Sequence, residues 1–338
     1  MKTTRPPVCP PAGSVLLFAT MALAISVIPL PIAVADGPAD NLAENVRPIP
    51  PLGMEVAEAA TEALRWRCAA VRGQWEALVG KARQQASAKE QGSPTLTDLE
   101  SLTPEILVFP RAVELAIEFQ QFYKPADLER ASQLLDEAAR RIQVAQDGGQ
   151  WRDVVGLGDG STQQLFVGGY RSKIDGSYQP YGLVVPPGFA KADARPRRLD
   201  LWFHGRGETL SEVGFLSTQM SSPGRYAPAD TLVLHPYGRY SNAFKFAGEI
   251  DVLESLEYVR GRLPVDPLRI SVRGFSMGGA ACWQFATHYS DRWFAANPGA
   301  GFSETPEFLR FFQDENVVET APPYQQKLWQ LYDLSLIH

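Results

Sequence analysis

One short stretch, residues 268–279, constrains the fold more than any other part of the sequence. Its first half, with Ile270 and Val272, is apolar and β-prone, and it ends in Gly-Phe-Ser-Met-Gly-Gly. The residues that follow, 280–286, are helix-prone and contain no breaker. A strand, a sharp turn at a serine and then a helix form the context of the G-x-S-x-G nucleophile elbow. The sequence therefore predicts that Ser276 lies at such an elbow.

Glycine is expected on both sides of this serine for a steric reason. A serine that stands clear of a sheet has to occupy a strained turn. Side chains two residues before and after it would collide with the adjoining strand and helix, and Gly274 and Gly278 remove those side chains. Gly279 extends the pattern. The helix behind the serine would aim free N–H groups at an oxyanion. We therefore predict that Ser276 is a catalytic nucleophile; an ordinary tight turn is the alternative.

The N-terminus has the pattern of an export signal. Two basic residues precede an apolar run over residues 15–34, and Ala-Val-Ala ending at Ala35 fits the small-residue cleavage rule. Two prolines late in the run disfavour a lasting transmembrane helix. We expect residues 1–35 to be a signal peptide, and the protein to be periplasmic or secreted without stable membrane insertion. Residues 36–53, rich in proline and polar residues, are expected to be a linker.

Residues 54–149 are predicted to form a helical region. Apolar residues recur at steps of three and four over residues 56–78 and again over residues 128–145. The pair Thr103-Pro104 has the pattern of a helix start, a capping residue followed by proline. We expect roughly three packed helices that support or cap the rest of the chain. A module that binds a substrate or partner is the alternative.

Residues 150–338 are predicted to form an α/β domain, because strand-like apolar runs alternate there with helical patterns. These runs are residues 164–167, 181–185, 199–203, 231–235, the elbow strand and 293–296. The glycine pair at 168–169 is interpreted as a turn. The pattern predicts an antiparallel opening and then a mostly parallel sheet with helices on both faces. Function should gather at the carboxyl ends of the strands, where His204, His235 and Ser276 fall.

These features resemble the α/β-hydrolase superfamily, and within it the prolyl-oligopeptidase-type serine peptidases and the esterases related to them. The resemblance is carried by His-Gly-Arg-Gly at residues 204–207, by residues 265–270 and by residues 274–279. It covers about residues 160–335. The elbow is specific to the superfamily, but it does not separate a peptidase from an esterase.

The resemblance implies roles for particular residues. Ser276 would be the nucleophile, and the oxyanion hole would combine the N–H of Met277 with an N–H of Gly205 or Arg206. His204 would shape this loop rather than act as the base. A Ser nucleophile needs a base to take its proton.

The chain departs from the superfamily after the elbow. The acid and the histidine of the triad follow the serine, on loops after further strands. Here one more strand, at 293–296, is followed by two short helical segments near 306–312 and 325–332. We expect the sheet to be incomplete at its C-terminal edge, with the chain truncated and the triad acid and histidine beyond residue 338.

Charge and composition exclude other classes. A net charge of −6 with no basic block argues against nucleic acid as a partner. No Cys/His cluster has metal-ligand spacing, so we expect no metal and no cofactor. Cys68 and Cys282 are expected to be buried free thiols.

The sequence predicts an exported serine hydrolase that cleaves a peptide or ester bond through an acyl-enzyme on Ser276. Its substrate would be a small molecule, a peptide or an ester. One alternative is a carboxylesterase acting on polysaccharide-linked esters. Another is a non-catalytic binding or scaffold protein that keeps the elbow, and the truncated chain itself would be inactive if it lacks the base.

Overall fold

The computed structural model describes residues 49–334 except 89–93, 159, 190–194 and 313–315, and all of them belong to one unit of the chain. The predicted signal peptide, its cleavage near Ala35 and most of the predicted linker lie outside the described residues. Within the described part, none of the helices combines the length and the apolar character that a membrane crossing requires.

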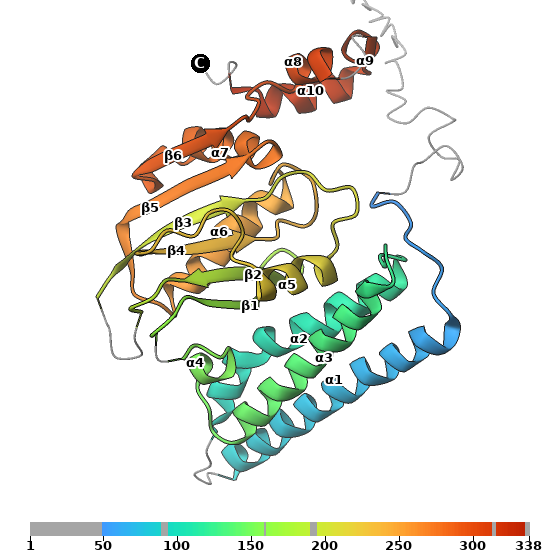
Figure 1. The fold of residues 1–338 in the computed structure, drawn as a ribbon, viewed down its shortest axis with the longest axis vertical. Helices are drawn as coiled ribbons and strands as arrows, with labels where there is room; N and C mark the ends of the chain where they lie inside the picture. The colour runs from blue at the N-terminus through green and yellow to red at the C-terminus, as the bar shows by residue number, and fades with distance from the viewer. Residues whose placement is uncertain (1–48, 89–93, 159, 190–194, 313–315, 335–338) are drawn as a thin grey trace, which may run out of the picture. The chain divides into compact units, whose positions relative to one another are not determined.

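Three long helices form the first part of the described chain (Figure 1). They are α1 (Glu58–Ser87), α2 (Leu96–Glu118) and α3 (Ala126–Gln146). Their apolar stripes meet in a common core that includes Trp75, Phe109 and Leu135. Ion pairs also join α1 to its neighbours, with Arg72 on Glu114 of α2. The predicted helical region is therefore a packed set of helices.

The start of α2 differs from the prediction. The Thr95 hydroxyl accepts a hydrogen bond from the Asp98 N–H at 3.2 Å, and the Asp98 carboxylate accepts one from the Thr95 N–H at 3.2 Å. This capping box satisfies the first free amides of the helix. The predicted start at Thr103 was wrong, and the helix continues through Pro104 and Pro110.

The second part of the chain is built on a six-stranded sheet in the order β1-β2-β4-β3-β5-β6. The strands are β1 (Gln164–Arg171), β2 (Tyr178–Val185), β3 (Arg197–Phe203), β4 (Thr231–Pro236), β5 (Val265–Phe275) and β6 (Ala295–Gly299). The β1–β2 and β2–β4 pairs are antiparallel, and the β4–β3, β3–β5 and β5–β6 pairs are parallel. The predicted mostly parallel sheet with an antiparallel opening is confirmed.

The glycine pair interpreted as a turn lies inside β1 instead, where Gly168 pairs with Tyr181. The reason is the close approach of α2 to this strand. A Cβ on Gly168 would overlap the Glu105 carboxylate, and one on Gly169 would overlap the Pro104 carbonyl. These glycines therefore let a helix pack against the strand rather than let the chain turn.

Two apolar cores lie on the two faces of this sheet. Phe166 and Val167 are neighbours on β1, yet they belong to different cores, as the alternation of a strand requires. One core joins α1–α3 and α5 (Glu212–Ser221), and the other joins α6 (Ala247–Arg260) and α7 (Met277–His288). Shorter elements complete the described chain: α4 (Trp151–Val154), a 3-10 turn (Ser290–Arg292), α8 (Thr305–Phe312), α9 (Asn316–Glu319) and α10 (Pro323–Tyr332).

A buried carboxylate fastens α2 to the sheet. Glu105 is fully buried, and its oxygens accept hydrogen bonds from Trp151 Nε1 at 2.6 Å, Tyr258 Oη at 2.7 Å and Tyr181 Oη at 2.9 Å. The Gly169 N–H donates a further bond at 3.2 Å. A buried charge is tolerated only when its lone pairs are satisfied in this way.

Both described cysteines are buried free thiols, as expected. Cys68 lies in α1, and Cys282 lies in α7. Burial raises the pKa of Cys68 to about 12 and that of Cys282 to about 11. The helices and the elbow region thus each hold one unreactive thiol.

Candidate active site

The elbow begins at the end of β5, where Ser276 has φ 57° and ψ −121°. This backbone conformation is unfavourable for any residue except glycine. The Ser276 N–H donates to the Gly299 carbonyl of β6 at 2.9 Å, and its carbonyl accepts from Ala280 in the first turn of α7 at 3.0 Å. The side chain is exposed. Both neighbouring elements therefore hold the strained turn, and the hydroxyl projects from it.

Each glycine of the elbow lies against another backbone segment. A Cβ on Gly274 would overlap the backbone of Gly278, and one on Gly278 would overlap the Phe203 carbonyl at the end of β3. A Cβ on Gly279 would overlap the Gly299 carbonyl. The three glycines therefore allow the strand, the turn and the helix to touch without intervening side chains.

A left-handed serine between a parallel strand and a helix defines the nucleophile elbow of one group of folds. The chain has an α/β-hydrolase fold. The fold implied by the sequence resemblance is thereby confirmed. In such a hydrolase the N-terminus of the helix after the serine directs free amides at the reacting group, and Met277 is the first residue of α7.

The chain shows limited similarity to known proteins. No family model matches the chain, and no curated protein matches it. Among solved structures, the fluorophosphonate-binding serine hydrolase F of Staphylococcus aureus is 19% identical, with a TM-score of 0.38 over 47% of this chain and 65% of that one. A prolyl endopeptidase is 17% identical, with a TM-score of 0.37 over 51% of this chain and 26% of that one.

A ferulic acid esterase from Anaeromyces mucronatus is 13% identical, with a TM-score of 0.32 over 42% of this chain and 59% of that one. The chain spans less than two thirds of the length of each of these three proteins. At such low identity and TM-score, the hydrolase fold is assigned from the chain's own elbow and sheet.

The predicted oxyanion donors lie on two segments beside the serine. Met277 follows it directly, and Gly205 and Arg206 follow β3, which is the parallel neighbour of β5. A Cβ on Gly205 would lie 3.7 Å from the Phe275 carbonyl, so this loop runs close to the elbow. The Arg206 side chain forms an ion pair with Glu208. The roles of Met277, Gly205 and Arg206 as amide donors stay predictions.

Two of the described histidines, His204 and His235, lie in surroundings that do not suit a general base. The ring nitrogens of His204 lie 2.9 Å from the carbonyls of Gly205 and Tyr237, and burial lowers its pKa. His235 is buried in β4, and burial lowers its pKa to about 3. Among the described residues, we find no hydrogen bond from the Ser276 hydroxyl to a histidine or a carboxylate.

Ser276 opens into a cavity of about 360 Å³. Its apolar wall includes Phe302 and Phe308, whose rings stack with centroids 4.3 Å apart. Polar and charged groups complete the lining: Arg206, Glu208, Tyr240, Ser241, Asn242, Lys245 and Thr305. Burial lowers the pKa of the Lys245 ammonium. The cavity combines an aromatic wall with hydrogen-bonding groups beside the hydroxyl.

Sequence reasoning missed the segment after β4, which supplies much of this lining. Several of its residues have positive φ although none of them is glycine: Arg239, Tyr240, Ala243, Phe244 and Phe246. Such residues are uncommon in left-handed conformations and draw attention to functional sites. The residue types carry no left-handed preference, so no signal in the sequence could have found this loop.

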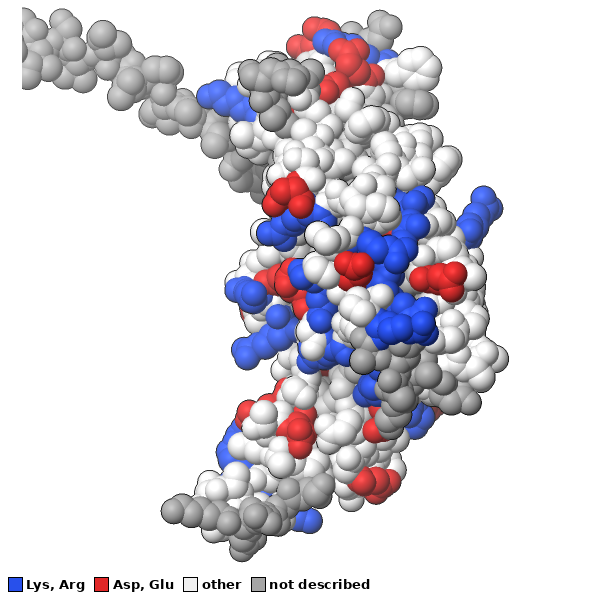
Figure 2. All heavy atoms as spheres, turned by 90° about the vertical axis from the view of Figure 1, so that its left-hand side faces the viewer, with Lys and Arg blue, Asp and Glu red and all other residues white. Residues whose placement is uncertain are grey.

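Charge is distributed unevenly on the face in Figure 2, which is the left-hand side of Figure 1. Lysine and arginine gather at its centre, with acidic side chains among and around them.

No group of His, Cys, Asp and Glu that could hold a metal ion occurs within the described ranges.

Proposed function

We propose that this protein is a serine hydrolase that transfers an acyl group to water through an acyl-enzyme on Ser276. The observation that carries the proposal is the conformation of this residue. An exposed serine at φ 57° between β5 and α7 is costly to hold. Such strain is retained where a hydroxyl must be presented to a substrate.

The chemistry follows from the geometry. The Ser276 oxygen would attack the carbonyl carbon of the substrate while a base removes the hydroxyl proton. The N–H groups of Met277 and of Gly205 or Arg206 would stabilise the oxyanion, each by about 3–4 kcal/mol when aligned. Collapse of the tetrahedral intermediate expels the alcohol or amine, which takes the proton back from the base. Water, deprotonated by the same base, then attacks the acyl-enzyme, which releases the carboxylic acid and restores the serine hydroxyl.

The proposal requires a base and an acid for Ser276 that the described histidines do not supply. The ring nitrogens of His204 face backbone carbonyls, and His235 is buried in the sheet. His288 is the last residue of α7, whereas Ser276 directly precedes the first residue of that helix. Export by residues 1–35 is also part of the proposal, and it is supported by the sequence pattern alone.

The substrate would be an ester or a peptide that fits a cavity of about 360 Å³. The stacked Phe302 and Phe308 rings favour a substrate with an apolar group close to the scissile bond. A second function is a non-catalytic binding protein that keeps the elbow. It is favoured by the lack, among the described residues, of a histidine bonded to Ser276.

The two functions differ in their response to a fluorophosphonate probe. In the full-length protein we expect covalent labelling at Ser276, identified by peptide mass spectrometry, and none in Ser276→Ala. Hydrolysis of p-nitrophenyl esters and of chromogenic peptides by the same protein would separate an esterase from a peptidase. A folded full-length protein that takes up no probe and hydrolyses neither substrate would support the binding protein instead.

A further inference from the structure

A strained loop borders the cavity beside Ser276. We define the β4 loop as residues 237–246, which follow β4 and lead into α6. Besides Gly238, its left-handed residues have φ values between 55° and 90°: Arg239, Tyr240, Ala243, Phe244 and Phe246. Backbone strain of this kind persists only where the surroundings over-determine the conformation. The contacts of the loop therefore indicate what holds it and what it holds.

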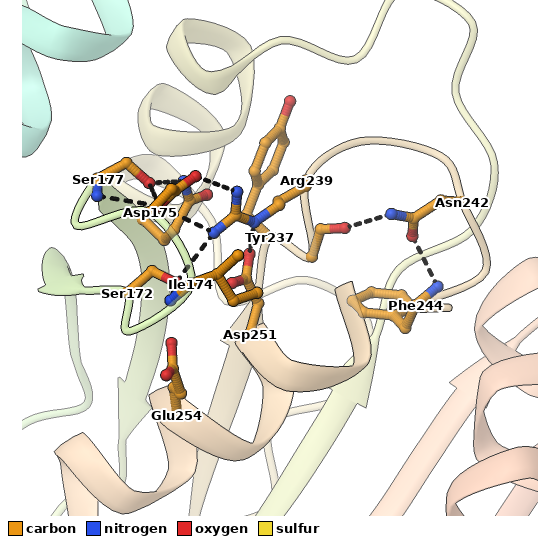
Figure 3. Close-up of polar contacts among 12 residues, drawn as sticks. Ser172, Ile174, Asp175, Ser177, Tyr237, Arg239, Asn242, Phe244, Asp251 and Glu254 are labelled. Atoms are coloured by element: carbon orange, nitrogen blue, oxygen red, sulfur yellow. Dashed lines mark hydrogen bonds and ion pairs between the residues drawn. The ribbon is translucent and has the colours of Figure 1, made fainter. Parts of the chain in front are cut away.

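One end of the β4 loop is anchored by Arg239 (Figure 3). Its guanidinium donates to Asp175 Oδ2 at 2.6 Å, to Asp251 Oδ2 at 2.9 Å and to Ser172 Oγ at 3.0 Å. Asp175 and Ser172 lie between β1 and β2, and Asp251 lies in α6. The planar guanidinium thus ties the loop to two separate parts of the chain, because each of its three nitrogens bonds a different side chain.

Asn242 stabilises the middle of the loop. Its Nδ2 donates to the Gly238 carbonyl at 2.9 Å, and its Oδ1 accepts from the Phe244 N–H at 2.8 Å (Figure 3). A short amide side chain that bonds its own backbone in this way compensates for a turn without glycine.

Several further contacts of the β4 loop reach residues 204–208, which follow β3. The Ser241 hydroxyl accepts from the Gly207 N–H and donates to the Gly207 carbonyl, both at 3.0 Å. The Tyr240 hydroxyl donates to the Glu208 carbonyl at 2.8 Å. The Tyr237 carbonyl lies 2.9 Å from His204 Nε2. The segment after β3 is therefore held at both of its ends by the β4 loop.

We propose that Ser241 is a positioning residue for the oxyanion hole and that Arg239 anchors the loop that carries it. The proposal rests on the proposed function. Gly205 and Arg206 lie between the two held positions, His204 and Gly207, in a segment whose two glycines give it little stiffness of its own. An oxyanion donor is effective only when its N–H stays within tenths of an ångström of its place. Ser241 also lines the cavity, but in this role it acts through its two hydrogen bonds to the backbone of Gly207.

The test is the rate of fluorophosphonate labelling in the full-length protein, measured over a range of probe concentrations. For Ser241→Ala we expect the maximal labelling rate constant to fall by about tenfold to a hundredfold, because the phosphonyl oxygen loses an aligned donor. The probe concentration giving half the maximal rate should change by less than about twofold. The final labelled fraction should stay the same, since loss of folded protein lowers that fraction and not the rate constant.

Three variants complete the experiment. Ser241→Thr keeps the hydroxyl and should restore the native rate. Ser221→Ala removes a serine that bonds only its own helix, through the Ser217 and Thr218 carbonyls, and should label like the native protein. Arg239→Lys should slow labelling as Ser241→Ala does. The double variant should be slowed by much less than the product of the two single effects, because both act on one loop.

The outcomes separate the two proposals. If the native protein is labelled at Ser276 and Ser241→Ala is labelled at the same maximal rate, the positioning role is overturned and the hydrolase stands. The role is also overturned if Ser241→Ala lowers only the final labelled fraction. If the folded native protein is not labelled, the proposed function itself fails.

Discussion

Gly278 shows at the scale of a single residue how closely the elbow is packed. A Cβ on Gly278 would overlap the Phe203 carbonyl, whereas a Cβ on Gly80 in α1 would meet nothing within 4 Å. We expect Gly278→Ala to destabilise the protein by about 2–3 kcal/mol through overpacking. Gly80→Ala should stabilise it by up to about 1 kcal/mol, because alanine is the better helix former. Urea unfolding measures both, and equal effects of the two substitutions would contradict the packing described for the elbow.

His235 makes the stability of the protein depend on pH. Burial lowers its pKa from 6.5 to about 3, so the unfolded chain takes up a proton first as the pH falls. Stability is therefore lost as the pH falls from about 6.5 toward about 3, by about 2 kcal/mol at pH 5 from this residue.

We expect His235→Gln to lose about 2 kcal/mol less stability than the native protein between pH 8 and pH 5, because glutamine does not titrate. Urea unfolding at the two pH values measures the difference. His288→Gln, at the end of α7, is the matched control for removing a histidine elsewhere. The same loss of stability in the native protein and in His235→Gln would show that this buried imidazole is not responsible.

At the scale of the elements, Glu105 determines how strongly α2 is held to the sheet. In Glu105→Gln an amide N–H would face a donor from Trp151, a tyrosine or the Gly169 backbone. We expect a loss of about 2–4 kcal/mol in the free energy of unfolding. Glu100 on the same helix is exposed and lies 3.4 Å from Arg83, so Glu100→Gln should change stability by less than about 0.5 kcal/mol. Similar values for the two variants in urea unfolding would argue against the buried network.

The elements also show what the sequence could predict. The elbow strand and its neighbours were predictable because an apolar run that ends in glycine is a local signal. The start of α2 was missed because the Thr95–Asp98 box competes with a second plausible cap at Thr103. Gly168 and Gly169 were misinterpreted because a close helix requires the same residue type as a turn.

At the scale of the whole molecule, the fold was more predictable than the site. Ser276 could be named because its motif is contiguous. The β4 loop could not, because its conformation depends on Arg239 meeting Asp175 and Ser172, which lie 64 and 67 residues away. Partners so distant leave no periodic or local trace in the sequence. The same holds for the aromatic wall of the cavity, which α8 supplies through Phe308.

The two buried cysteines can report how fast each half of the chain opens. Cys68 and Cys282 can react with iodoacetamide only after the surrounding structure opens, because burial keeps each thiol protonated and covered. If the Glu105 contacts make the helices and the sheet open as one body, both thiols should be alkylated at one common rate in mild urea, as mass spectrometry of the two peptides can measure. Faster alkylation of Cys68 would mean that the helical layer detaches while the serine elbow is still intact.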